Sequence, residues 1–225
     1  MARKVIESGM RNMSKKLFAE FLGTFALVFL GAGAIVSGKA DLQGVALAHG
    51  LAIFVSISAL AGISGAHFNP AVSAVMLATK RICGQDFFYF VLAQLAGATV
   101  ASLALNYIYG HSNGYGLPTI ASGTSIGAGV LAEILGTALL VAVIFGVAVD
   151  KRSVAASHPG LPIGLTITAI IFSVGPITGV ALNPARWFGP AIVSGDWTNA
   201  WVYIVAPIAG ALIAGFTYQA VAKPE

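Results

Sequence analysis

The sequence has few charged residues and a single cysteine. Charged side chains make up 9% of its 225 residues and hydrophobic side chains 57%, and the mean hydropathy of +0.88 is far above that of soluble domains. So little charge excludes an ordinary soluble fold, because most of the chain needs an apolar solvent. Cys83 alone permits no internal disulfide and offers no cysteine cluster for a metal or redox centre. We therefore expect a membrane protein without a cofactor or metal.

Signatures of catalysis and of nucleic-acid binding are also missing. The sequence has no phosphate-binding loop, pair of catalytic carboxylates or metal-ligand spacing. The segment Gly62–Gly65 matches the GxSG pattern of intramembrane serine proteases, but its repeat mate has Thr178 in place of Ser64 and no span supplies a plausible histidine partner. The net charge of +4 comes mainly from cations on one side of the membrane, as described below, rather than from a nucleic-acid surface. We expect neither an enzyme nor a nucleic-acid partner.

Apolar runs of about 20 residues, the length that crosses a bilayer, dominate what is present. Six of them predict membrane-spanning helices: Lys16–Ser37, Leu42–Gly62, Phe87–Tyr109, Gly127–Val149, Leu161–Val174 and Thr198–Val221. The 27 glycines suit such helices, because small residues let them approach closely in lipid. The predicted fold class is an all-α membrane protein, with residues 1–15 as a tail and 16–225 as one membrane domain.

The basic residues predict the orientation. Ten of the twelve lysines and arginines fall on one side of a six-span arrangement, which the positive-inside rule makes cytoplasmic. They are Arg3, Lys4, Arg11, Lys15, Lys16, Lys80, Arg81, Lys151, Arg152 and Lys223. Both termini are therefore expected in the cytoplasm, and the lack of a transit peptide favours the cell membrane. Lys39 lies outside, whereas Arg186 falls inside an apolar segment, where a cation usually has a function.

The chain contains an internal duplication. Ala19–Val28 and Ala132–Val141 are identical at seven of ten positions with an offset of 113, and Ile63–Ala71 resembles Ile177–Ala185 with an offset of 114. Repeat 1 covers residues 16–109 and repeat 2 covers residues 127–221. Each half holds three spans, and an odd number makes the second half enter the membrane from the opposite side. The result is an inverted 3+3 repeat, in which function is expected where the halves meet.

Each half contains one Asn-Pro-Ala motif. The motifs are Asn69, Pro70 and Ala71, and Asn183, Pro184 and Ala185. Asn favours the N-cap and Pro the first helical position, so each motif should begin a helix after a non-helical segment. The runs Pro70–Thr79 and Pro184–Ser194 would each measure about 15 Å, half the bilayer core. Two such half-helices would meet at the midplane with their positive dipole ends together and repel cations there.

These residues resemble the aquaporin, or major intrinsic protein, family over essentially the whole chain. The resemblance rests on AEFLGT and AEILGT, SGAHFNPAV and TGVALNPARWFGP. It implies six transmembrane helices plus two half-helices in an aquaporin-like fold. It also implies a homotetramer in membrane lipid, with one pore per subunit that passively conducts water or small neutral solutes and excludes ions and protons.

The resemblance further implies a narrow selectivity filter. Its four positions are His49, Ile171, Val180 and Arg186. With FGPAIVSGDW, this set is similar to vacuolar plant aquaporins, some of which also pass ammonia or hydrogen peroxide. Strict water channels usually carry a second His where this chain has Ile171. Two alternatives stay open, a structural salt bridge between Arg186 and Glu133 and a plain core role for His49.

Three further polar residues are expected to support the half-helix loops. In the family, glutamates at the positions of Glu20 and Glu133 accept hydrogen bonds from the loop backbone, and His67 resembles the histidine that supports the inner loop. A proton relay through the two glutamates is the alternative. His158 is expected to be a solvated loop residue rather than a pH sensor.

Two other transport functions compete with a water channel. A coupled transporter would share the inverted repeat but needs substrate-driven gating and normally an ion site. A glycerol facilitator of the same family usually has Asp directly after the filter arginine, where this chain has Trp187, and an aromatic residue where it has Val180. Water is therefore the expected main solute, with glycerol as the alternative.

Overall fold

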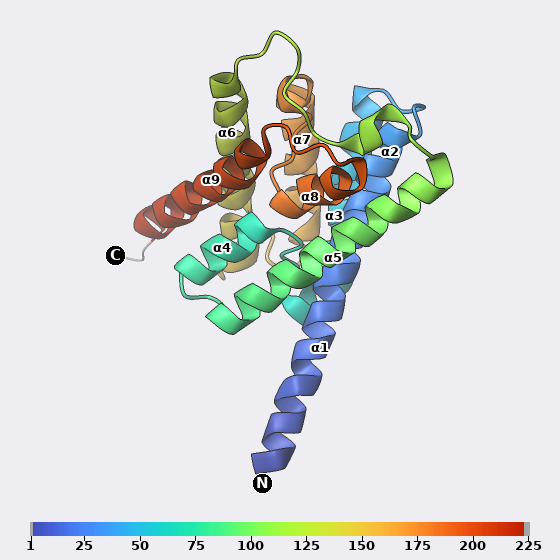
Figure 1. The fold of residues 1–225 in the computed structure, drawn as a ribbon. Helices are drawn as coiled ribbons and strands as arrows, with labels where there is room; N and C mark the ends of the chain where they lie inside the picture. Colours follow the sequence, from blue (N-terminus) through green and yellow to red (C-terminus); the bar gives the residue numbers. More distant parts are fainter. Residues whose placement is uncertain (1, 223–225) are drawn as a thin grey trace.

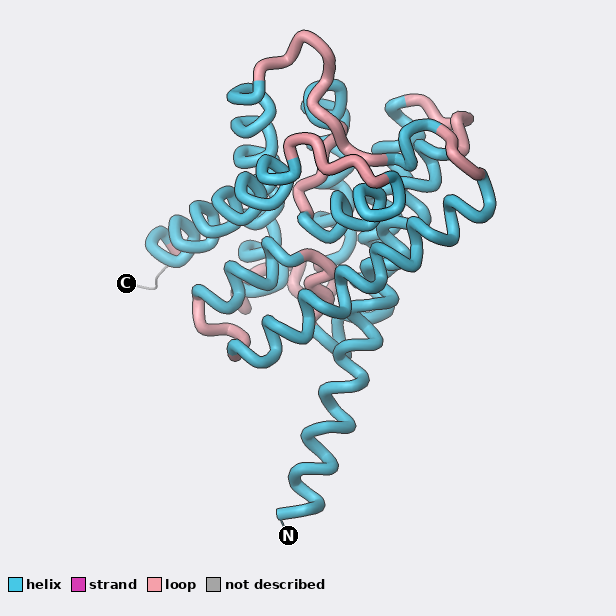
Figure 2. Tube along the Cα trace, in the orientation of Figure 1, coloured by secondary structure: helices cyan, strands magenta, loops and turns pink. Residues whose placement is uncertain are grey.

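The structure, a computed structural model, describes residues 2–222 and the side chains of residues 12–222. The described residues contain helices and loops but no strand (Figures 1 and 2). The α-helices are α1 Ala2–Ala26, α2 Gly33–Val36, α3 Leu42–Ser64, α4 Pro70–Ala78, α5 Gly84–Tyr109, α6 Ile126–Ile144, α7 Gly160–Thr178, α8 Pro184–Ser194 and α9 Ala200–Val221. A π-helical turn at Leu27–Ala32 joins α1 to α2, and another at Phe145–Val149 continues α6.

Within residues 2–222, six helical segments are long and apolar enough to cross a membrane. They are Asn12–Val36, Leu42–Ser64, Gly84–Tyr109, Ile126–Val149, Gly160–Thr178 and Ala200–Val221. This confirms the predicted all-α membrane fold with six spans. The cation Lys223 lies outside the described residues, as do the side chains of Arg3, Lys4 and Arg11.

Several helix ends differ from the sequence prediction. Helix α1 begins at Ala2, so most of the expected tail is helical, and α5 begins three residues earlier than expected, where the Cys83 sulfur accepts the N–H of Asp86. Helix α7 continues through Pro176 to Thr178, although we expected it to stop at Val174. It ends where Gly179 takes a left-handed φ of 70° and donates its N–H to the Gly175 carbonyl.

Close helix packing repeats between the two halves. Helix α1 packs on α5 and α6 on α9, while α3 packs on α7 across the junction between halves. A Cβ atom on Gly97 would overlap the carbonyl oxygen of Phe21, and one on Gly210 would overlap that of Ile134. Both pairs show the offset of 113, so a glycine at the equivalent position lets two helices pack closely in each half.

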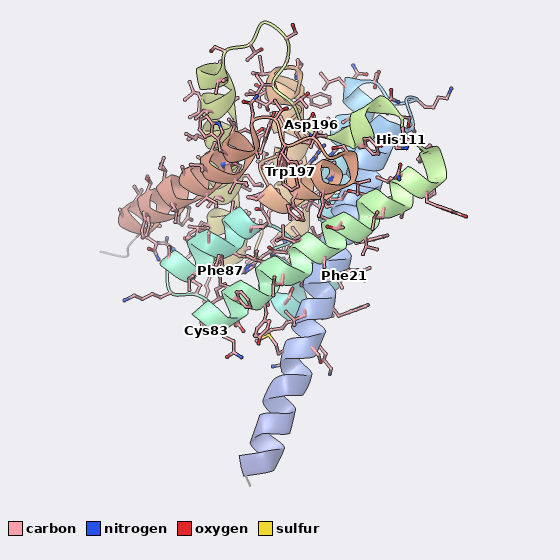
Figure 3. The ribbon with its side chains drawn as sticks, viewed as in Figure 1. Phe21, Cys83, Phe87, His111, Asp196 and Trp197 are labelled. Carbon is pink, nitrogen blue, oxygen red and sulfur yellow. The ribbon has the colours of Figure 1, made fainter. Side chains whose placement is uncertain are left out.

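The two short helices lie between the long ones. Figure 1 shows α4 and α8 in the middle of the molecule, where they also contact each other. Figure 3 places Cys83 and Phe87 toward one end of the molecule and His111 toward the other. We call these ends the inner and the outer side, following the predicted orientation.

Candidate functional site

The two Asn-Pro-Ala motifs begin the two short helices. Asn69 and Asn183 have extended backbones, with φ of −156° and −153°, and each is followed by proline in the first turn. The Asn69 Oδ1 accepts the N–H of Ala71 at 2.8 Å, and the Asn183 Oδ1 accepts that of Ala185 at 2.9 Å. Each asparagine thus caps its half-helix by the interaction that makes Asn a favoured N-cap.

The same two asparagines also join the halves. The Asn69 Nδ2 donates to the Leu182 carbonyl and the Asn183 Nδ2 donates to the Phe68 carbonyl, both at 2.8 Å. Both side chains line one cavity. An amide nitrogen carries two hydrogens, so each asparagine keeps a second N–H beyond the one it gives to the opposite loop. These two hydrogens are available to a molecule in the cavity.

The loops before the motifs have an unusual backbone conformation that is the same in both halves. Phe68 and Leu182, directly before the asparagines, have φ of 51° and 53°, and Ala66 and Val180 have φ of 54° and 45°. A positive φ is uncommon for non-glycine residues and a genuine outlier for β-branched valine. Such a conformation persists only where the surroundings hold it.

Two buried glutamates hold these loops. Glu20 accepts hydrogen bonds from the backbone N–H groups of His67 at 3.0 Å and Phe68 at 2.7 Å. Glu133 accepts them from Ala181 at 3.0 Å and Leu182 at 2.8 Å. The two carboxylates therefore stand in equivalent positions against the loops, as expected from the repeat.

Hydroxyl groups complete both carboxylate sites. Ser64 donates to Glu20 at 2.6 Å, and Thr178 donates to Glu133 at 2.7 Å. The Ser64 hydroxyl also accepts the N–H of Ala66, so its contacts explain the GxSG pattern as part of the loop support. Thr178 accepts the N–H of Val180 in the same way.

His67 belongs to a polar cluster found on the inner side of the first half. Its Nδ1 lies 3.0 Å from the Ser73 hydroxyl, which also accepts a hydrogen bond from Gln94 Nε2. Gln94 Nε2 also lies 2.8 Å from Glu20, and Phe90 packs edge-on against the His67 ring. We did not predict Ser73 or Gln94 as site residues, although polar residues inside apolar runs were a visible signal.

The loops and motifs border a cavity of about 310 Å³. It extends from His49 and Arg186 on the outer side, past both asparagines, to Ala148 and Pro159 on the inner side. Much of its lining is aliphatic, namely Ile53, Ile57, Val72, Leu140, Ile144, Ile163 and Ile167. The loops before the motifs and the polar side chains of His49, Asn69, Asn183 and Arg186 also line it. The cavity is therefore a passage with both apolar and polar lining.

All four predicted filter residues line the outer part of this cavity. They are His49, Ile171, Val180 and Arg186, which come from α3, α7, the second loop and α8. His49 Nδ1 lies 2.8 Å from the Val45 carbonyl, an acceptor, so this nitrogen carries a hydrogen. The Nε2 atom of a neutral ring is then an acceptor, and it lies 3.3 Å from Arg186 Nη2. His49 is therefore more than an apolar core residue.

Arg186 is held by the outer loop instead of by an acid. Its Nη1 donates to the Gly116 carbonyl at 2.8 Å, a partner that the sequence did not reveal. Within the described part of the chain, the ion pairs do not include Arg186, and its Nε has no partner. The salt bridge to Glu133 that we considered is not formed there. The guanidinium thus places a charge without a direct ion-pair partner, and an Nε–H without a protein acceptor, among the residues that line the outer end of the passage.

His158 does not line this passage. It is exposed in the inner loop before α7, and its Nδ1 is 2.9 Å from the Ser157 hydroxyl.

Comparisons with known proteins agree with this arrangement of six spans around a passage. The model of the family described as "Major intrinsic protein" matches residues 7–218. The chain is 39% identical over 210 residues to aquaporin NIP1-1 of Zea mays, covering 91% of this chain and 74% of that protein. It is 38% identical over 244 residues to aquaporin AqpM of Methanothermobacter thermautotrophicus, covering 93% and 98%.

Two further matches carry names that refer to glycerol. The chain is 43% identical over 210 residues to glycerol uptake facilitator protein-like 6 of Lactiplantibacillus plantarum, covering 90% of this chain and 95% of that protein. The X-ray structure of the aquaglyceroporin from Plasmodium falciparum superposes with a TM-score of 0.86 at 29% identity, covering 94% and 98%. The chain belongs to the major intrinsic protein family. It is therefore a multi-pass membrane channel, and members of this family are channels rather than enzymes.

Proposed function

We propose that this channel conducts water passively and excludes ions and protons. The observation that carries the proposal is the pairing of Asn69 with Asn183 beside one passage, each at the start of a half-helix. The second N–H of each amide can donate to the oxygen of a passing neutral molecule. The positive ends of both half-helices face the same point, which disfavours cations.

This geometry also accounts for exclusion of protons. A water molecule that accepts hydrogen bonds from both asparagines uses both of its lone pairs. Its own hydrogens must then point along the passage toward the neighbouring waters, so it cannot accept a proton from either. A relay of protons is therefore interrupted at the midplane, and hydronium itself is repelled by the helix dipoles.

The proposed filter comprises His49, Ile171, Val180 and Arg186. The Arg186 charge repels cations and its free N–H groups bind an oxygen, while His49 adds a polar edge. Ile171 and Val180 form the apolar side of the passage. Small neutral solutes such as ammonia or hydrogen peroxide match this lining and are proposed as secondary solutes.

A glycerol facilitator is the second candidate. It is favoured by the apolar Ile171, which suits the carbon backbone of a polyol, and by the names of two of the similar proteins. Trp187 in place of Asp and Val180 in place of an aromatic residue favour water.

Stopped-flow light scattering on proteoliposomes tests the proposal. Vesicles with the wild-type protein should shrink faster than empty vesicles under an impermeant osmolyte and under glycerol, without re-swelling in glycerol. Rapid re-swelling would favour the glycerol facilitator, and shrinkage as slow as that of empty vesicles would contradict a water channel. In Arg186→Ala, glycerol and protons should enter faster, because the filter loses its charge and its largest side chain.

Assembly and location follow from the same proposal. We propose a homotetramer in the cell membrane with both termini in the cytoplasm and residues 16–225 as one channel domain. Large apolar side chains such as Leu51 and Leu139, 55% and 60% exposed in the single chain, would face lipid or a neighbouring subunit. Native mass spectrometry in detergent would measure the subunit number.

A further inference from the structure

The two half-helices differ at several buried positions, and one of them carries a tryptophan in the second half. Four residues after its asparagine, the first half has Ser73, which takes part in the polar cluster around His67. The equivalent residue of the second half is Trp187, and it is also fully buried. Both halves have an asparagine cap, the same loop conformation and a carboxylate that accepts two loop N–H groups. At this position the outer half-helix therefore has a large buried ring with an indole N–H, where the inner half-helix has a small hydroxyl group.

Trp187 ties the outer loop to the half-helix. Its Nε1 donates a hydrogen bond of 3.2 Å to the Pro118 carbonyl. Its neighbour Arg186 donates to the carbonyl of Gly116, two residues earlier in the same loop. Two consecutive side chains of α8 thus hold two nearby carbonyls of one loop segment. Gly116 orients the filter arginine through its carbonyl. Its position depends on the segment 116–118, which Trp187 holds at Pro118.

Tyr203 connects Trp187 to the backbone next to Val180, another predicted filter residue. Its ring stacks on Trp187 with 5.6 Å between centroids and 8° between planes. Its hydroxyl donates to the Thr178 carbonyl at 2.9 Å, and the Thr178 hydroxyl accepts the N–H of Val180. Val180 has the unfavourable φ of 45° and lines the passage.

The two held segments also contact each other directly. Ala121 donates its N–H to the Ile177 carbonyl at 2.9 Å. A Cβ atom on Gly179 would lie 2.9 Å from the Pro118 Cα, so the backbones of the two segments touch there. Leu117 and Ile120 of the outer loop pack against the cluster that contains Trp187 and Tyr203.

We propose that the Trp187–Tyr203 pair is a positioning and specificity-determining element, which sets the width of the filter by fixing Gly116 on one side and Val180 on the other. It deepens the proposed function and rests on it. Without the pair, the outer loop and Val180 can move outward, and the passage can admit a molecule wider than water. The main effect is on discrimination between solutes rather than on water flux.

Two conservative substitutions test this proposal. Trp187→Phe retains an aromatic ring against Tyr203 but removes the bond to Pro118, and Tyr203→Phe retains the stacked ring but removes the bond to Thr178. Trp197→Phe is the matched control, because Trp197 contacts Trp187 edge-on and is 47% exposed at the rim of the cluster. In proteoliposomes, the ratio of glycerol to water permeability should rise about fivefold in each of the first two variants, the factor that corresponds to one buried hydrogen bond. It should change less than about twofold in Trp197→Phe.

Hydrogen–deuterium exchange gives a second readout that does not depend on conduction. Exchange in residues 113–121 should accelerate in Trp187→Phe and stay unchanged in Trp197→Phe. Folded Trp187→Phe and Tyr203→Phe variants with the wild-type permeability ratio would overturn the positioning role, as would unchanged exchange in Trp187→Phe. If the wild-type protein itself conducts no faster than empty vesicles, the proposed function fails instead, and the exchange rates alone decide whether Trp187 holds the loop.

Discussion

Glu20 and Glu133, 113 positions apart, bind their half-helix loops through the same set of donors. Each carboxylate accepts hydrogen bonds from one hydroxyl group and from two successive backbone N–H groups. Both side chains are fully buried. A carboxylate can accept several bonds at once and thus satisfies loop groups that would otherwise be unpaired in the membrane. This equivalence favours loop support over a proton relay.

Removing one of these carboxylates should therefore destabilise the channel. Glu133→Ala leaves the Thr178 hydroxyl and the N–H groups of Ala181 and Leu182 without their acceptor, which should lower the free energy of unfolding by at least about 3 kcal/mol. Thermal unfolding in detergent, followed by tryptophan fluorescence, measures the loss. Glu133→Gln keeps the shape of the side chain and one acceptor oxygen, so its thermal midpoint should lie between those of the wild type and Glu133→Ala. An unchanged midpoint for Glu133→Ala would contradict the role assigned to the loop contacts.

Asn183→Asp tests the asparagine pair at the midplane. The remaining Oδ1 can still cap α8 at Ala185, but neither protonation state of the acid supplies two N–H groups for Phe68 and for water. Water permeability should fall about fivefold, and proton leak should rise because the donor pair is broken. A pH-sensitive dye inside the vesicles measures the leak. Wild-type values for both fluxes would show that the second N–H does not bind the conducted molecule.

A cysteine at Val180 should make the channel sensitive to thiol reagents. Val180 lines the cavity near Arg186, whereas native Cys83 is exposed on the inner side and is not among the lining residues. Mercuric ion should block most water flux through Val180→Cys and leave the wild type unaffected. Val180→Cys combined with Cys83→Ser is the control and should be blocked equally. Resistance of both variants would place Val180 outside the conducting path.

Asp150 predicts a pH-dependent contribution to stability on the inner side. The Arg152 guanidinium, which donates to both carboxylate oxygens, holds the pKa of Asp150 below its ordinary value, with further hydrogen bonds from the Arg152 backbone N–H and the Tyr218 hydroxyl. A lowered pKa in the folded state gives stability that is present above about pH 4 and is lost as the pH falls through the folded-state pKa. The Arg152 side chain is 63% exposed, so solvent screens the pair and the effect should be small.

The measurement compares thermal midpoints of the wild type and Asp150→Asn between pH 3 and pH 7. The wild type should unfold at the higher temperature above about pH 5, and the difference should shrink below about pH 4. Arg152→Ala should remove most of the same difference. A gap that stays constant down to pH 3 would contradict the assigned cause.

The sequence predicted the fold well because its strongest signals are local. Apolar length gives the spans, and the Asn-Pro-Ala motifs give the starts of α4 and α8, since capping depends on neighbouring residues. Helix ends were less accurate. Helix α7 continues past Pro176 because a proline near the end of a helix removes only one bond, so Val174 was a wrong end point.

The candidate site was predicted where the repeat, the family resemblance or, for Arg186, a cation inside an apolar segment marked it. Glu20, Glu133 and the asparagines stand out because they occur twice. The Gly116 carbonyl and the bond from Trp187 to Pro118 could not be predicted, because backbone groups of a long loop carry no sequence signal. The bonds from each asparagine to the opposite loop also require the three-dimensional structure. The filter roles remain predictions for the flux experiments.

The exchanged asparagine bonds also constrain the order in which the chain can assemble. The carbonyl that receives the Asn69 amide belongs to Leu182, and Phe68 receives its donor from Asn183, so neither loop is completed by its own half. During synthesis the first half leaves the ribosome with this donor and this acceptor still unpaired. They can pair only after Leu182 and Asn183 have been synthesised. Both loops therefore close together and late, and a nascent chain that stops short of Leu182 should remain open and sensitive to proteases.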